Sequence, residues 1–238
     1  SNSICSIVKN STGTWRWRTG FNLSLAQKLI QAHKDISSEY PVKMIEENKE
    51  QRTSVIDLEG KGFIIKEFIY SKRWGKVSPG RERWLSNWRL EMSGLPVSKC
   101  LAWLEDADGK SYLVKEYIKG DSLYASLKNA AGDKVKRKFL LGEFLNLLAR
   151  LYFMGFVHNN LTAKDIIVNS EEGLTRLYLA GSNAIEYHRR VSRAHWQQHF
   201  HQLAETLPDV PALNQDFAQL FAEARDKWLG TASGQAII

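Results

Sequence analysis

Strand-like and helix-like patterns of apolar residues divide the chain into a first half rich in predicted strands and a second half rich in predicted helices. Short runs of alternating or continuous apolar residues indicate strands, whereas apolar residues that recur every three or four positions indicate helices. The Glu59–Gly62 segment has the composition of a hairpin turn between two such runs. The predicted strands are Val42–Ile45, Thr53–Leu58, Gly62–Phe68, Leu101–Leu104 and Ser111–Tyr117.

Two helices are predicted among these strands. The first lies near Leu23–Ile30, and Asn22 is suited to cap its N-terminus. The second covers residues 81–94, because Gly94 and Pro96 are termination signals.

The second half of the chain contains the strongest helical pattern, from Lys134 to Met154. Residues 156–168 and 174–179 follow as a predicted small hairpin, and residues 188–229 as a helical segment with a break at Pro208–Pro211. The apolar face predicted for the long helix consists of Phe139, Leu141, Phe144, Leu145, Leu148, Leu151 and Tyr152.

This order of elements, a β-meander with one inserted helix and then a helical half, indicates an α+β fold. We expect an N-terminal extension over residues 1–40 that packs on a β-rich lobe over residues 41–119. A reduced helical lobe is expected over residues 120–238.

Composition narrows the class of protein. The hydrophobic content of 43% is ordinary for a globular protein, and no stretch approaches the ~18 apolar residues of a membrane span. The two cysteines argue against a disulfide framework or a structural zinc site, so a cytoplasmic location is expected. The net charge of +7 favours anionic partners, or else reflects a basic surface without a single partner.

The most informative stretch is Phe156–Asn169, FVHNNLTAKDIIVN, in which a short apolar run, a turn and a β-rich run follow the long helix. It resembles the catalytic loop of kinase-like phosphotransferases, written HRDxxxxN. His158 keeps the histidine of that loop, which implies a structural role. Asn160 stands at the position of the catalytic aspartate, and Asp165 at that of a metal-binding asparagine.

Other spacings extend this resemblance. Lys66 lies inside an apolar strand, where a kinase holds the phosphates of its nucleotide. The resemblance implies a carboxylate partner for Lys66 on the next helix, either Glu82, which we favour, or Glu91. Tyr178 comes 13 residues after Asp165, at the position of a second metal-binding aspartate.

The segment YLVKEYIKGDSL resembles the hinge of a kinase, whose backbone binds adenine. Glu116 and Ile118 would supply the carbonyl and amide groups. Together, the motifs between Val42 and Arg190 resemble the lipopolysaccharide core kinase family of Gram-negative bacteria. The resemblance implies a two-lobed protein-kinase-like fold, ATP and Mg²⁺ as cofactors, and a heptose or Kdo sugar as the phosphate acceptor.

Departures from the family pattern indicate impaired phosphotransfer. The segment Glu46–Arg52, where the loop over the phosphates is expected, has no glycine. The Asn160 side chain cannot accept a proton from a hydroxyl group, and Tyr178 has no carboxylate for Mg²⁺, so that Asp165 is the remaining metal ligand.

We therefore favour a pseudokinase that acts by binding nucleotide, glycolipid or a protein partner. An active sugar kinase, with Asp165 or Glu186 as a replacement carboxylate, and a basic adaptor without nucleotide binding remain alternatives. The expected partner is lipopolysaccharide core or another anionic glycolipid at the inner-membrane surface. No nucleic-acid-binding module is recognised, so no nucleic-acid partner is expected.

Overall fold

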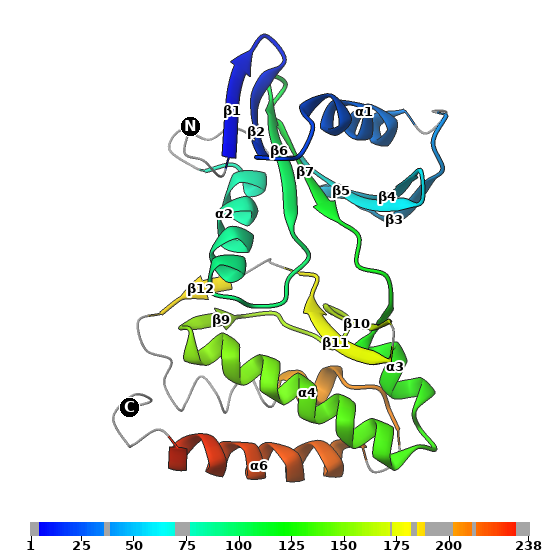
Figure 1. The fold of residues 1–238 in the computed structure, drawn as a ribbon, viewed down its shortest axis with the longest axis vertical. Coiled ribbons are helices and arrows are strands. Elements are labelled where there is room, and N and C mark those ends of the chain that lie inside the picture. Colours follow the sequence, from blue (N-terminus) through cyan, green and yellow to red (C-terminus); the bar gives the residue numbers. More distant parts are fainter. Residues whose placement is uncertain are drawn as a thin grey trace. The chain divides into compact units, whose positions relative to one another are not determined.

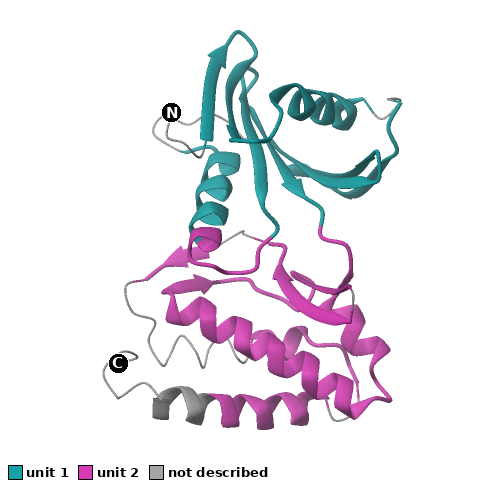
Figure 2. Cartoon of the chain, in the orientation of Figure 1, with its two compact units in different colours: residues 1–89, 98–117 teal, residues 90–97, 118–238 magenta. Residues whose placement is uncertain are grey.

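The structure is a computed structural model, which describes residues 5–35, 39–69, 77–171, 173–181, 185–188, 202–210 and 213–231. The chain divides into two compact units (Figure 2). Unit 1 contains residues 1–89 and 98–117, and unit 2 contains residues 90–97 and 118–238.

Unit 1 is built on a seven-stranded antiparallel sheet in the order β1-β2-β6-β7-β5-β4-β3 (Figure 1). The fold is thus mixed α+β, as predicted, with a large antiparallel sheet and several helices. The strands are β1 (Cys5–Asn10), β2 (Gly13–Arg18), β3 (Val42–Glu47), β4 (Gln51–Leu58), β5 (Lys61–Ile69), β6 (Cys100–Asp106) and β7 (Lys110–Glu116).

Two helices pack against this sheet, α1 (Leu23–Lys34) and α2 (Pro79–Met92). Because side chains alternate between the faces of a strand, β5 contributes to two separate clusters. Phe63 and Ile65 pack with α1 residues, whereas Phe68 packs with Trp84 of α2.

The local signals at the ends of α1, α2 and the β4–β5 hairpin act as predicted. Asn22 Oδ1 accepts a hydrogen bond of 2.8 Å from the Ser24 N–H at the start of α1. Glu59 and Gly60 both have positive φ and join β4 to β5 in a two-residue turn. Gly94 follows α2 with a φ of 72°, in the left-handed conformation that ends helices.

Two strands of unit 1, β1 and β2, were not predicted. The segment Trp15–Arg18 forms most of β2 and pairs with β1 and β6. Trp15 is buried, and Arg16 lies on the opposite face of the strand. The alternation Trp-Arg-Trp-Arg is itself a strand signal.

Unit 2 combines helices with short strands. Helix α4 packs against α6, and their core includes Phe144 and Phe217, whose rings stack with centroids 6.3 Å apart. The elements are β8 (Asp121–Ser122), α3 (Leu123–Asn129), α4 (Lys134–Phe153), β9 (Phe156–His158), β10 (Ile166–Glu171), β11 (Leu174–Leu179), β12 (Ile185–Tyr187) and α6 (Leu213–Thr231).

The segment after α4 that was predicted as one hairpin forms two separate strand pairs. β10 pairs with β11, whereas β9 pairs with β12 and lies outside that hairpin. Part of the predicted helical segment at 188–229 is helical, over residues 202–206 and in α6, and residues 189–201 lie outside the described residues.

The prediction that Phe139 belongs to the buried face of α4 is wrong. Its side chain is 49% exposed, because it lies one position away from the stripe that contains Leu140 and Phe144. Arg137 is buried instead, and its Nη2 donates to Asp216 Oδ2 of α6 at 3.2 Å.

Candidate functional site

Lys66 lies on β5, opposite Thr53 of β4 and Leu113 of β7. Its side chain is half-buried and points to the sheet face that carries Phe68, away from its neighbour Glu67. The charged residue of β5 that is fully buried is therefore Glu67, which the sequence prediction overlooked.

A second lysine lies on the same face as Lys66. Lys115 is opposite Ile64 of β5 and Cys100 of β6, and it is 2% exposed. Burial lowers the pKa of Lys115, and this effect is partly opposed by Cys100. In the sequence, the burial of Lys115 is indicated by its position inside the largely apolar run YLVKEY.

The two proposed carboxylate partners of Lys66 both lie on α2. Glu82 is exposed in the first turn of the helix, and Glu91 is half-buried near its end. The choice between them stays a prediction.

The hinge-like positions lie at the division between the units. The Glu116 N–H donates to the Lys99 carbonyl at 2.9 Å, and the Glu116 carbonyl accepts from Ser98 Oγ at 2.6 Å. A ligand that donates a hydrogen bond at this position would share the Glu116 carbonyl with Ser98. The Glu116 N–H is already bonded to Lys99. Ile118 is half-buried and is the first residue of this part of unit 2.

The residues of the loop-like motif take different positions in unit 2. His158 is buried at the end of β9, where its backbone is paired with Ile185. Asn160 is exposed in the following turn. The neighbouring Asn159 donates to Glu186 Oε1 at 2.8 Å, which ties this turn to β12.

Asp165 is half-buried immediately before β10. Its Oδ2 accepts hydrogen bonds from the Thr162 N–H at 2.9 Å and from Thr162 Oγ1 at 2.7 Å. Side-chain oxygens that bond to nearby backbone groups stabilise turns of this kind. The second oxygen, Oδ1, is the one that would lie 3.0 Å from a Cβ atom added at Gly181.

The strand register determines which residue lies beside Asp165. The Ala180 N–H donates to the Asp165 carbonyl at 2.8 Å, and Gly181 follows Ala180. Tyr178 pairs with Ile167, two residues further along the hairpin, and is half-buried. The position next to the Asp165 carboxylate is thus that of Gly181, which the count of 13 residues did not identify.

Few further protein ligands in the described part of the chain are therefore available to bind a metal ion together with Asp165. Among the residues that the structure describes, no group of three or more His, Cys, Asp or Glu side chains could hold a metal. Mg²⁺ prefers six oxygen ligands, so Asp165 alone would leave most of the coordination to water and substrate.

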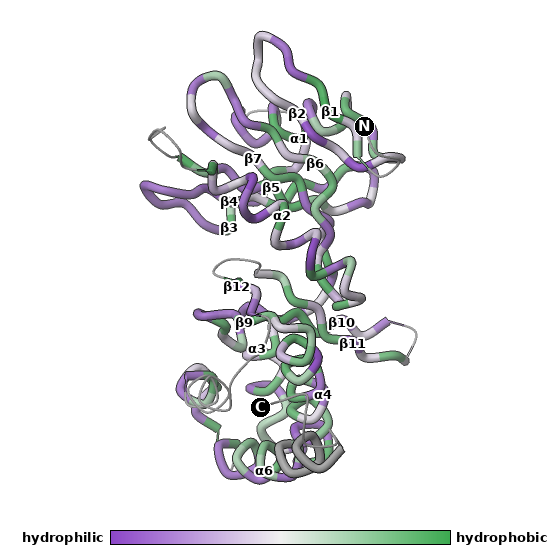
Figure 3. Tube along the Cα trace, turned by 90° about the vertical axis from the view of Figure 1, so that its left-hand side faces the viewer, coloured by the Kyte–Doolittle hydropathy of each residue, from purple (hydrophilic) through white to green (hydrophobic). Residues whose placement is uncertain are grey.

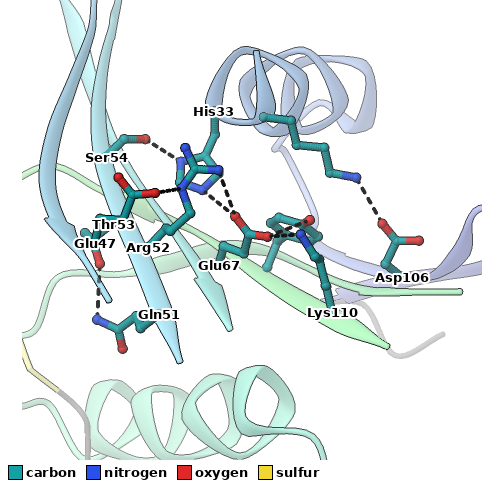
Figure 4. A network of polar contacts seen from close by, with 11 residues as sticks. His33, Glu47, Gln51, Arg52, Thr53, Ser54, Glu67, Asp106 and Lys110 are labelled. Carbon is teal, nitrogen blue, oxygen red and sulfur yellow. Dashed lines mark hydrogen bonds and ion pairs between the residues drawn. The ribbon is translucent and has the colours of Figure 1, made fainter. Parts of the chain in front are cut away.

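Unit 1 contains a buried polar network around Glu67 (Figure 4). Glu67 Oε1 accepts from Lys110 Nζ at 2.6 Å and from the Tyr112 hydroxyl at 3.3 Å. Glu67 Oε2 lies 3.3 Å from His33 Nε2 and 3.7 Å from Arg52 Nη1. Burial alone would raise the pKa of Glu67, but hydrogen bonds and charges of His33 and Lys110 hold it at about 2.

His33 links this carboxylate to Ser54, because its Nδ1 lies 2.7 Å from Ser54 Oγ. An ionised carboxylate only accepts hydrogen bonds, so His33 Nε2 carries a proton. Serine, histidine and carboxylate in this order resemble a nucleophilic triad. All three side chains are buried, with exposures of 0%, 0% and 1%, so no substrate reaches Ser54 and the arrangement stabilises the fold.

A groove of about 460 Å³ lies within unit 2. It contains the exposed ring of Phe139, two lysines and two carboxylates, so its charges balance. Asn169, also in the groove, donates to the Lys119 carbonyl at 2.9 Å. The polar side chains of its lining are Lys119, Asp121, Ser126, Asn129, Lys136, Asn169, Ser170, Glu171 and Thr175.

No protein-family model matches this chain, and no curated protein matches it. No described helix is long and apolar enough to cross a membrane.

Proposed function

We propose that this chain is a two-lobed, protein-kinase-like protein of the lipopolysaccharide core sugar kinase type, with impaired phosphotransfer. It acts by binding nucleotide, a glycolipid or a partner protein in the cytoplasm, at or near the inner membrane. The observation that carries the proposal is the Asp165 turn, where one ordered carboxylate has a glycine beside it and, among the described residues, belongs to no group of three metal-ligating side chains.

The chemistry of phosphoryl transfer explains why this arrangement favours binding over turnover. Removing a general base lowers the rate by about 10²–10⁴, and Asn160 offers an amide at the position of that base. Metal ions supply much of the remaining charge stabilisation. Asp165, with one oxygen already bonded to Thr162, is a weak ligand for Mg²⁺ without a second carboxylate.

Nucleotide binding rests on Lys66, because a half-buried ammonium group on a strand can contact phosphates without a metal. The glycolipid part of the proposal is supported by the unit 2 groove, whose amides, hydroxyls and carboxylates are groups that hydrogen-bond sugar hydroxyls. The net charge of +7 favours an anionic lipid surface.

The test is thermal unfolding with ATP, with and without Mg²⁺. The proposal predicts stabilisation by ATP in both conditions, of about 2.7 kcal/mol at a concentration 100 times the Kd. Stabilisation that requires Mg²⁺ would instead support an active kinase, and no stabilisation in either condition would support a basic adaptor.

Two variants of β5 make this test specific. Lys66→Ala should abolish the stabilisation by ATP. Lys61→Ala is the control, because Lys61 is exposed at the start of the same strand. Equal effects of ATP on both variants would contradict the assignment of Lys66.

A further inference from the structure

The two edges of the unit 1 sheet differ in how well they are protected from pairing with another strand. At one edge, the six residues of β3 include Lys43, Glu46 and Glu47, and the register with β4 shifts between Met44 and Glu46. Charged side chains and bulges are features that keep edge strands from adding further strands.

The other edge, formed by β1, lacks this protection. All six residues of β1 pair with β2 without a register shift, and Lys9 is its one charged residue. Ile7 and Val8 are 50% and 40% exposed. In the described part of the chain, no strand pairs with β1 on its outer side. Figure 3 shows the contrast, with the β3–β4 hairpin mostly hydrophilic and hydrophobic residues within β1.

A groove of about 380 Å³ lies next to this edge, within unit 1. The indole rings of Trp84 and Trp88 on α2 stack there, with centroids 6.3 Å apart and planes inclined by 18°. Arg16 of β2 is the one charged residue of the lining, and its guanidinium lies 5.9 Å from the centroid of the Trp103 ring. The other lining residues are Cys5, Ser6, Ile7 and Leu85.

We propose that β1 and this groove bind an extended peptide segment of a partner protein, which adds as an eighth strand to the sheet. Main-chain hydrogen bonds to β1 would supply affinity, and pockets for alternate side chains would supply specificity. The segment carries an apolar or aromatic side chain for the half-buried Trp88, which stacks on the buried Trp84, and an Asp or Glu two residues away for Arg16. Side chains two residues apart on a strand lie on one face, about 6.5–7 Å apart.

Charge identifies the partner as acidic. Residues 5–18 contain Lys9, Arg16 and Arg18 and no acidic residue. A second copy of the chain would bring its own Lys9 and a further charge of +7 to this edge, which is unfavourable. A different protein with an acidic, apolar segment fits the edge better. This inference does not depend on nucleotide binding.

The experiment selects binders from a phage-displayed library of random dodecapeptides, using the full chain as bait. Enriched peptides are synthesised with a fluorescent label, and their affinity is measured by fluorescence anisotropy. We expect alternating sequences with an apolar residue and an acidic residue two positions apart. Failure to enrich such sequences would overturn the proposal.

Variants at the two edges of the sheet separate this site from general stickiness. Ile7→Glu places a negative charge on the unprotected edge, which repels an acidic segment, and should weaken peptide binding at least tenfold. Ile45→Glu is the matched control, since Ile45 is a 57% exposed isoleucine on β3, and it should leave the affinity unchanged. Equal losses in both variants would contradict the proposed edge.

A charge exchange tests the groove itself. Arg16→Glu should weaken the acidic peptides at least tenfold and restore binding of peptides in which the acidic residue is replaced by lysine. This rescue cannot result from loss of folding. Sedimentation analysis provides the remaining outcome. A dimer of the unmodified chain that Ile7→Glu dissociates would show that a second copy, rather than an acidic partner, occupies the edge.

Discussion

Glu67 in unit 1 and Asp165 in unit 2 are two carboxylates in opposite situations. Glu67 is buried, and both of its oxygens are close to donors from α1, β4 and β7. Asp165 is half-buried, and a single residue, Thr162, binds one of its oxygens. A carboxylate whose oxygens are all engaged can only stabilise the fold, whereas one with an oxygen still available can also bind a ligand.

The largest expected effect is that of Glu67→Gln. Glu67 is buried, whereas the side chains of its charged partners Lys110 and Arg52 are 41% and 21% exposed, so the main loss is that of hydrogen bonds to a charged group, about 1.5–3 kcal/mol. Chemical denaturation should show a loss of this size. Glu82→Gln is the control, because Glu82 is exposed on α2 and its loss should change stability by less than about 0.5 kcal/mol. Similar effects of both variants would show that the Glu67 network is not structural.

Acid should reveal the same network in the unmodified protein. The pKa of Glu67 is lowered from 4.5 in the unfolded chain to about 2 in the fold, so the unfolded state binds the proton more readily. This contribution to stability is complete above pH 4.5 and is lost as the pH falls toward 2. Unfolding measured over this window should show a steeper decline for the unmodified protein than for Glu67→Gln. Parallel curves would contradict the lowered pKa.

A smaller effect is expected from Asp165→Ala. Hydrogen bonds to a charged group contribute about 1.5–3 kcal/mol, and this variant removes those from Thr162. The loss of unfolding free energy should lie at the lower end of this range, since the Asp165 side chain is half-buried. Thr162→Val, which removes the hydroxyl but keeps the backbone donor, should lose less, as measured by the same denaturation. A greater loss of unfolding free energy in Asp165→Ala than in Glu67→Gln would contradict the view that Glu67 is the more structural carboxylate.

The smallest expected effect concerns Gly181→Asp, which would give Asp165 the neighbour that a metal site requires. An added Cβ lies 3.0 Å from Asp165 Oδ1, so the two carboxylates would repel one another without a cation. We expect a melting temperature a few degrees lower than that of the unmodified protein, restored by Mg²⁺, since about 1 kcal/mol shifts a chain of this size by about 2–4 °C. Gly181→Asn, without the second charge, should not respond to Mg²⁺.

Several elements could be predicted because their signals are local. The hairpin turn at Glu59–Gly60, the cap at Asn22 and the helix end at Gly94 depend on conformations that a few residues favour by themselves. Strand β2 could also have been predicted, since Trp15–Arg18 alternates strictly.

The candidate site was predictable only in part. The motif led to Asp165, and the structure shows its carboxylate held by Thr162. Counting residues pointed to Tyr178 as its neighbour, whereas the register of β10 and β11 leads to Gly181. The length of a hairpin turn changes such a count without changing the motif around it, so spacing alone could not locate this position.

The amino-acid sequence by itself determined the helices, most strands and their turns, because periodicity and backbone preference act over a few residues. Tertiary structure alone decided which charges were buried and which were paired. His33 and Tyr112 are separated from Glu67 by 34 and 45 residues, and only the packing of α1 on the sheet brings them together. Burial makes such a carboxylate depend on its partners, and burial is a property of the packed molecule rather than of any short segment.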